Sequence, residues 1–499
     1  MTAALDHADA PDRRLHPLSW LFVLLQQLKQ FILPLIALFF FGRGSSDQYG
    51  GNELWPLIGV GVLALASLWQ YFTYRYRITG DSLIVKSGLF ERSLRQIPFA
   101  RIHNVAVHQS LLHRLFGVAE VRLESAGGKK PEAQMRVLKL DDAIALELLV
   151  RRSSHVSADA VAQPAEIGDL LLQLPPAEVL RLGLISNRGL VVVGAGVAAL
   201  SQVSPRMLPN LFEDWGKTLF GLAGSQQFDF VHYALVGASL FAGLVLVLRL
   251  FSVLLALLQY YGFRLEEHGR RLTVERGLLT RWRTSVPRRR IQAWTLREGV
   301  MHRLLKRRTL EIDTAVVEEQ NESRALRELA PVATPAECEA LIRHLLPGAA
   351  WPPPQWQPLH AKAWWRLLLP GAVFAAVLCA VLTWRFGVWG LLGLGWLAWA
   401  IFESRQHAQR AGYALDAGLV AVRGGWWSRH WRFAELDKLQ ALRLTQSPLD
   451  RRFGMASLWL DTTGAGTFAP PLRIRYLAES KARALHAKLG REIARRPLR

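Results

Sequence analysis

The sequence predicts a polytopic α-helical membrane protein with about six transmembrane helices and three polar, β-rich modules. Three observations support this fold class. The 499-residue chain is 51% hydrophobic but also 20% charged, so apolar and charged stretches must be separated along it. The apolar stretches come in pairs, and the polar stretches that follow them share one aligned pattern. A chain of this length also predicts several domains.

Six apolar runs have about the length that a bilayer requires, since its hydrocarbon core takes roughly 20 helical residues. They lie at about 24–41, 54–72, 189–203, 231–258, 367–384 and 388–402. The third and sixth are short and need flanking residues, so an even number of spans is better supported than the number six. Residues 17–30 mix apolar and polar side chains, which predicts an interfacial helix and not a cleaved signal peptide.

Basic residues are distributed very unevenly between the two sides of the predicted spans. Of the 61 Lys and Arg, the loops within the pairs hold only Arg43, Arg206, Lys217 and Arg385. Because cytoplasmic loops carry the excess of bases, both termini and all three modules are expected in the cytoplasm. The net charge of +21 also favours an anionic partner such as lipid headgroups.

The expected organisation alternates membrane and polar segments. Residues 1–73 hold an N-terminal segment and the first two transmembrane helices, 179–259 the third and fourth, and 359–405 the last two. The modules between and after them occupy 74–178, 260–358 and 406–499.

The three modules align without a gap when Gly88, Gly277 and Gly425 are superimposed. Fourteen residues further on, each module has an aliphatic residue that follows a base; these pairs are Arg101–Ile102, Arg290–Ile291 and Lys438–Leu439. A register kept over three segments indicates an internal repeat. Alternating hydrophobic residues then predict a strand whose aliphatic side chain is buried while the preceding base stays in water.

Local signals predict β-strands followed by a closing helix in each module. Gly80 and Asp81 separate two β-rich runs, as in a hairpin. Thr334, Pro335 and Glu337 form a helix-start signal, with a capping residue, a proline at the first position and a glutamate at the third. Gly117 and its counterpart Gly454 suit a left-handed backbone, and Lys306 replaces them in the second module.

The motif residues of the first module resemble those of the bacterial pleckstrin-homology-like (PH-like) membrane proteins. They are Tyr76, Gly88, Pro98, Arg101-Ile102-His103, Leu111, Arg114 and Gly117. The second and third modules repeat most of the pattern, except that Glu435 replaces the proline in the third. The resemblance implies three PH-like β-sandwich modules with a C-terminal helix, in a protein of the bacterial inner membrane. It implies little about the ligand, because this fold hosts many functions.

Recurring and clustered bases are the candidate contacts for anionic lipid or a partner. They are Arg101, Arg288, Arg289, Arg290, Arg297, Lys306, Arg307, Arg308 and Lys438. Positive-inside charge alone would also explain the cluster. For the recurring Arg114, Arg303 and Arg451, we favour a structural role, in which each pairs with the acid that closes its repeat: Glu124, Asp313 and Asp461. Arg249, inside the fourth apolar run, is either functional or reaches the interface with its long side chain.

Motifs for catalysis or metal binding are lacking in the sequence. No phosphate-binding loop, nucleophile elbow or His-Glu-x-x-His motif occurs. The five-residue spacing of His103, His108 and His113 does not place them on one face. We therefore expect a non-enzymatic protein without cofactor, metal or nucleic-acid partner. It would bind membrane lipid headgroups or a protein partner, such as a smaller PH-like membrane protein, in a scaffold, stress or envelope role. A transporter or lipid-handling protein is the alternative.

Overall fold

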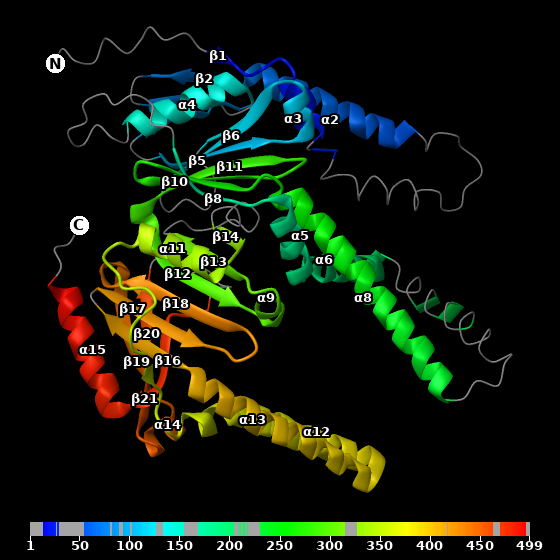
Figure 1. Cartoon of the computed structure of the whole chain (residues 1–499). Coiled ribbons are helices and arrows are strands. Elements are labelled where there is room, and N and C mark those ends of the chain that lie inside the picture. The colour runs from blue at the N-terminus through cyan, green and yellow to red at the C-terminus, as the bar shows by residue number, and fades with distance from the viewer. Residues whose placement is uncertain are drawn as a thin grey trace. The chain divides into compact units, whose positions relative to one another are not determined.

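The computed structural model describes most of the chain, shown as coloured ribbon in Figure 1. The described residues are 13–25, 27–28, 54–79, 82–88, 93–99, 102–125, 133–153, 168–203, 209–210, 213–214, 217, 230–314, 327–416, 418–462 and 470–495. They form two compact units. Unit 1 comprises 1–169, 266–286 and 316–325, and unit 2 comprises 170–265, 287–315 and 326–499.

Unit 1 contains the first module as two antiparallel layers. The first sheet has the order β1-β2-β3-β4, and the second begins β7-β6-β5. The strands are β1 (Arg13–Arg14), β2 (Arg75–Ile78), β3 (Ser82–Ser87), β4 (Ser93–Pro98), β5 (Ile102–Gln109), β6 (Val118–Ser125) and β7 (Ala133–Lys139). The helices are α2 (Leu54–Thr73), α3 (Leu111–Leu115) and α4 (Leu140–Ser153). Leu83, Phe99, Leu123 and Met135 are fully buried in the core of this module.

Two strands of the second module extend the second sheet of the first. β11 (Arg281–Pro287) pairs antiparallel with β5, and β10 (Arg271–Arg276) follows in the sheet order. The sequence repeat did not predict this exchange, because it treats each module as a separate sandwich.

Unit 2 contains the rest of the second module and the whole third module. Its apolar helices are α5 (Pro176–Ile185), α6 (Arg188–Val203), α8 (Phe230–Tyr260), α12 (Ala363–Phe386) and α13 (Leu394–Arg410), with η3 (Gly387–Gly393) between the last two. The second module adds η2 (Arg288–Arg290), β12 (Ile291–Glu298), α9 (Val300–Leu304), β13 (Arg308–Thr314), β14 (Glu328–Ala333) and α11 (Pro335–Leu345). β8 (Asp169–Gln173) and β9 (Arg264–His268) span the division between the units.

The third module repeats the architecture of the first. A short strand, β15 (Gln357–Pro358), precedes its membrane helices. After them come β16 (Gly412–Asp416), β17 (Leu419–Gly424), β18 (Arg429–Glu435), η4 (Leu436–Lys438), β19 (Leu439–Thr445), α14 (Pro448–Arg452), β20 (Met455–Thr462), β21 (Arg473–Ala478) and α15 (Glu479–Ala494). One sheet has the order β14-β13-β12-β18-β17-β16-β15, so β12 of the second module pairs with β18 of the third. The remaining sheet is β19-β20-β21.

Several local predictions are confirmed by this fold. The aliphatic residues of the repeat, Ile102, Ile291 and Leu439, are buried. Thr334 and Glu337 form a complete capping box with Pro335 in the first turn of α11. The left-handed position is occupied at φ 63° by Gly117 and at φ 51° by Lys306. The repeat therefore dictates backbone conformation even where a lysine must adopt it.

The described residues include fewer clear membrane spans than the six expected. Residues 234–260 and the stretch 363–410 are each long and apolar enough to cross a bilayer. The bent pair α5 and α6, with a 53° angle at its break, counts as a third if it forms one span. The first apolar run, 24–41, lies mostly outside the described residues. Six spans therefore stay a prediction.

The stretch 363–410 folds back on itself instead of crossing as one rod. α12 and α13 lie side by side in Figure 1 and pack against each other. The contact is close because a Cβ on Gly371 would come within 2.8 Å of the Ala400 Cβ. The fifth and sixth apolar runs thus form a helical hairpin, with η3 at its tip.

The boundary expected at residue 178 needs a correction. At the end of β8, the Leu174 amide donates to the Phe263 carbonyl at 3.1 Å. Residues 170–174 therefore pair with the start of the second module, although the sequence assigned them to the first. Each module takes a strand from before its membrane helices, which an alignment of the later strands does not reveal.

Candidate functional site

Most bases of the basic cluster in the second module are engaged in internal ion pairs or hydrogen bonds. Arg307 holds the Glu178 carboxylate with two nitrogens, at 2.7 and 2.8 Å, and this hydrogen bonding raises the pKa of Arg307. Arg308 pairs with Glu298 at 3.1 Å and Glu339 at 3.2 Å. These two bases therefore tie β13 to α5, β12 and α11 and leave little charge for a ligand.

Three further candidates of the cluster are partly engaged. Arg288 donates to the Leu345 carbonyl at 2.6 Å, which satisfies the C-terminal end of α11. Arg297 pairs with Glu311 at 3.2 Å. Arg290 is half-buried, and burial lowers its pKa.

Arg289 and Lys306 remain available. Both side chains are exposed, and neither makes an ion pair or hydrogen bond with the described residues. Lys306 follows α9 in the left-handed conformation, where its counterparts are glycine. These two are the bases of the cluster that can meet an anionic surface without breaking an internal contact.

The remaining two candidates lie in the other modules. Lys438 ends η4 and contacts Asp437 at 3.1 Å. Arg101 lies outside the described residues. The sequence placed the nine bases in one functional class, whereas the structure gives them different roles, because neighbouring acids from distant segments select which bases are neutralised.

The recurring arginine contacts the next module from two of the short helices, α3 and α9. Arg114 donates to the Leu278 carbonyl at 3.0 Å, and Arg303 donates to the Trp427 carbonyl at 3.1 Å. Asp313 is instead paired with Arg432 at 2.6 Å, with both side chains almost fully buried. The expected Arg303–Asp313 pair was therefore wrong. In each case the arginine reaches the turn of the next module.

Two arginines also join apolar helices to the modules of unit 2. Arg188, at the start of α6, donates to Glu328 at 3.0 Å and to the Tyr260 hydroxyl at 2.6 Å. Arg366 in α12 pairs with Asp450 of α14 at 3.1 Å. Their acidic partners come from unlike positions in the two modules and could not be identified from the sequence.

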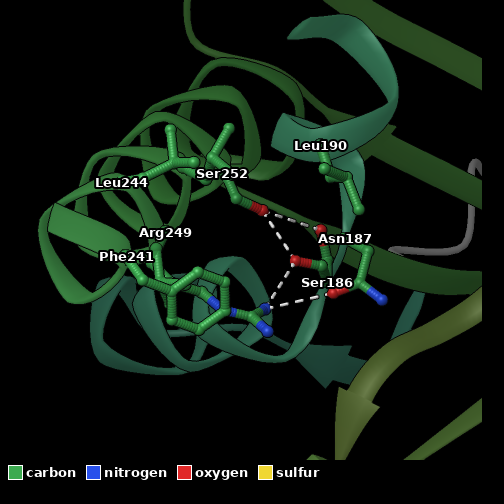
Figure 2. A pocket seen from close by; sticks show the side chains of 9 residues that line it. Ser186, Asn187, Leu190, Phe241, Leu244, Arg249 and Ser252 are labelled. Carbon is green, nitrogen blue, oxygen red and sulfur yellow. Dashed lines mark hydrogen bonds between the residues drawn. The ribbon is translucent and has the colours of Figure 1, made fainter. Parts of the chain in front are cut away.

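Arg249 lines a pocket of about 330 Å³ between α6 and α8 (Figure 2). Its guanidinium donates to the carbonyls of Leu184 and Ser186, at 3.0 and 3.3 Å, and to the Asn187 side chain at 3.2 Å. These acceptors lie at the break between α5 and α6, where carbonyls lack helical partners. The contacts give Arg249 a role that the sequence did not suggest: it satisfies carbonyls at the helix break, and an unsatisfied carbonyl in lipid is costly.

The rest of this pocket is mainly apolar. Figure 2 shows Phe241 and Leu244 of α8 and Leu190 of α6 around it, with Ser252 donating to the Ser186 carbonyl at 2.8 Å. Because a Cβ on Gly183 would lie 2.5 Å from the Val253 Cα, a glycine is needed for α5 to approach α8 so closely. The pocket can accept an apolar chain but has no free charged group.

Among the described residues, no group of histidine, cysteine or carboxylate side chains could hold a metal ion. His113 contacts Ser110 at 2.6 Å, and His108 contacts Glu120 at 3.3 Å. Burial raises the pKa of Cys338 to about 12, so its thiol is not a ready nucleophile.

The fold and these contacts define a membrane protein built from repeated β-modules, each of which is associated with apolar helices. Comparison with known families gives the same result. The bacterial PH domain family matches residues 23–154, 218–346 and 364–493, and the chain belongs to this family. The chain is also 22% identical, over 461 residues, to the UPF0699 transmembrane protein YdbT of Bacillus subtilis (strain 168). That match covers 88% of this chain and 90% of the relative. No solved structure matches it.

Proposed function

We propose that this protein is a non-enzymatic, multi-pass protein of the bacterial inner membrane, whose PH-like modules bind anionic lipid headgroups. The proposal includes six spans, with both termini and all three modules in the cytoplasm. A protein partner, such as a smaller PH-like membrane protein, is the other ligand class that such modules could take. The scaffold, stress or envelope role expected from the sequence would follow from either kind of binding.

The observation that carries the proposal is the selective exposure of Arg289 and Lys306. Most of their basic neighbours are held by acids or carbonyls, whereas these two have free, solvated side chains. A base near an anionic leaflet contributes about 1 kcal/mol to binding. Transport finds less support, because the guanidinium of Arg249 is engaged by three acceptors.

The test uses the full chain in nanodiscs of neutral phosphatidylcholine. Co-sedimentation is measured with vesicles of pure phosphatidylcholine and with vesicles that also contain phosphatidylglycerol. We expect binding to the anionic vesicles alone, weakened by salt as the Debye length falls from about 10 Å at 0.1 M to about 3 Å at 1 M. Replacing both Arg289 and Lys306 by glutamine should weaken binding by about 2 kcal/mol, roughly 30-fold.

A matched control removes the same charge elsewhere. Lys481 and Lys488 of α15 are exposed and have no ion-pair partner among the described residues. Replacing both by glutamine should leave vesicle binding within a few-fold of the original value. Equal binding to neutral and anionic vesicles, or an equal loss in both double variants, would contradict the proposal.

A further inference from the structure

The modules are joined by the same strand pairing at two places. In unit 1, β5 of the first module pairs with β11 of the second. In unit 2, β12 of the second module pairs with β18 of the third. We call this arrangement the module joint: the first strand of one module's second sheet lies antiparallel to the last strand of the next module's first sheet.

The two module joints have the same register. Thr284 lies opposite Ala106 in one, and the equivalent Arg432 lies opposite Thr295 in the other. The recurring arginine reinforces each joint, since Arg114 and Arg303 both donate to a carbonyl in the turn of the incoming module. Because both joints use the same pairing of equivalent residues, the module joint is a specific interface and not a chance contact.

Two edges of this series have no neighbouring strand among the described residues. β4, the counterpart of β11 and β18, is last in its sheet order, and β19, the counterpart of β5 and β12, is first in its own. Within the described residues, neither has a strand on its outer side. In β4, Leu94 is 65% exposed, and Arg95 and Gln96 are also exposed. Their counterparts in β18 include the fully buried Arg432 and Phe433.

Exposure on β19 shows the same contrast. Arg443 is exposed, whereas its counterparts Ala106 and Thr295 are buried inside module joints. An edge strand presents unpaired amides and carbonyls and is a template for another strand. Each of these two edges therefore matches the half of a module joint that the other one lacks.

The two edges carry an arginine and an aspartate at the positions of the buried Arg432–Asp313 pair. Arg95 occupies the position of Arg432, whose buried partner is Asp313. Asp461 occupies the position of Asp313, but it is exposed and has no ion-pair partner among the described residues. Arg451 occupies the position of Arg114 and Arg303, and its exposed side chain makes no hydrogen bond or ion pair with a described residue. The donor and acceptor of one more joint are thus both present on this chain.

We propose that the β19 edge of one copy of this chain pairs with the β4 edge of a second copy, as a third module joint. The common register places Leu94 opposite Leu444 and Arg95 opposite Arg443. Asp461 then lies beside both arginines and can pair with Arg95 as Asp313 pairs with Arg432, because Ala441, its partner in β20–β19 pairing, lies two residues from Arg443 on the same face. Since the two edges differ, the association is head-to-tail and builds a ring or a filament. It does not depend on lipid binding.

Disulfide cross-linking in native membranes tests the register. The full chain carries Leu94→Cys and Leu444→Cys in a Cys379→Ala background, while Cys338 stays buried and protonated. Oxidation should give dimers and higher multiples of the chain. The control combines Leu94→Cys with Thr445→Cys, whose side chain lies on the opposite face of the sheet. This pair should give few disulfide-linked multiples. A product at monomer mass, or equal yields from both pairs, would overturn the proposal.

A charge exchange tests the partner. Asp461→Arg should abolish multiples of the full chain in detergent, measured by size exclusion with light scattering, because only arginines then meet at the joint. Mixing it with the Arg95→Asp variant should draw it into complexes, since every joint between unlike variants again contains an aspartate; this also shows that Asp461→Arg is folded. Failure of the mixture to take up Asp461→Arg, or retention of multiples by Asp461→Arg alone, would overturn the proposal. So would a purified assembly in which a smaller PH-like protein occupies β19.

Discussion

At the scale of single residues, the structure separates bases that hold the fold from bases that face solvent. Arg307 and Arg308 each engage carboxylates with short contacts, and Arg432 is almost completely buried with Asp313. Removing one partner of such a buried pair typically costs 3–5 kcal/mol. Exposed bases such as Arg289 have no such role, so charge density alone is a poor guide to a binding site.

Lys306 is expected to destabilise its own turn. A non-glycine residue in the left-handed region costs roughly 1–2 kcal/mol. Glycine removes this cost, but it loses more backbone entropy on folding, which offsets roughly half of the gain. Lys306→Gly should therefore raise the free energy of unfolding by about 0.5–1 kcal/mol, measured by denaturant unfolding of the full chain in detergent. Gly454→Lys is the reciprocal control and should lower it. Loss of stability in Lys306→Gly would show that the lysine side chain makes a compensating contact.

His430 should make the protein sensitive to acid. Burial, with added repulsion from Arg297, Arg475 and His407, lowers the pKa of His430 to about 4. Between about pH 6.5 and 4, His430 is protonated in the unfolded chain but not in the folded chain. The free energy of unfolding therefore falls as the pH falls through this window. We expect the denaturation midpoint to drop across it and His430→Asn to reduce that slope. A parallel slope in the variant would assign the effect to other groups, such as His302, whose pKa burial also lowers.

At the scale of elements, β12 contributes buried side chains on both faces of its sheet. β12 buries Trp294 and Leu296, while Ala293, its neighbour on the alternate face, belongs to the core of the third module. The same strand pairs with both β13 and β18. An isolated second module would therefore expose strand edges and apolar faces that the full chain covers.

Ile291 tests the importance of this shared strand. It is 3% exposed at the start of β12. Truncating a buried isoleucine to alanine typically costs 2–5 kcal/mol. Ile291→Ala should lower the unfolding free energy of the full chain by that amount, whereas Arg289→Ala, two residues earlier and exposed, should change it by less than about 0.5 kcal/mol. The reverse ranking would mean that the inside and outside of this strand are misassigned.

At the scale of the whole molecule, membrane helices and β-modules alternate along the chain. Arg188 and Arg366 link helices of unit 2 to acids of the modules, at Glu328 and Asp450. These ion pairs at the ends of the apolar helices couple the membrane segments to the sheets.

Topology can be measured by reporter fusions. Fusions after Gly127, Glu319 and Arg499 should all report a cytoplasmic location, and one after Gln226 should report the opposite side. The reason is the concentration of Lys and Arg on the side of the modules. A module that scores outside would contradict the six-span arrangement, and the Gln226 fusion serves as the internal control.

The sequence by itself determined the features that recur. The glycine register, the buried aliphatic at Ile102, Ile291 and Leu439, and the capping box of α11 follow from local periodicity, and the structure confirms them. Local rules suffice there because strand alternation and helix capping involve residues close in sequence.

Only the tertiary structure decided which module each strand and charge serves. The pairing of β5 with β11, the partner of Asp313 and the engagement of Arg307 by Glu178 all join segments far apart in the chain. No periodicity encodes such partners, because an ion pair or a strand edge is selected by proximity in three dimensions. The same reason explains why Arg289 and Lys306 stand apart from their neighbours: the nearby acids face other bases.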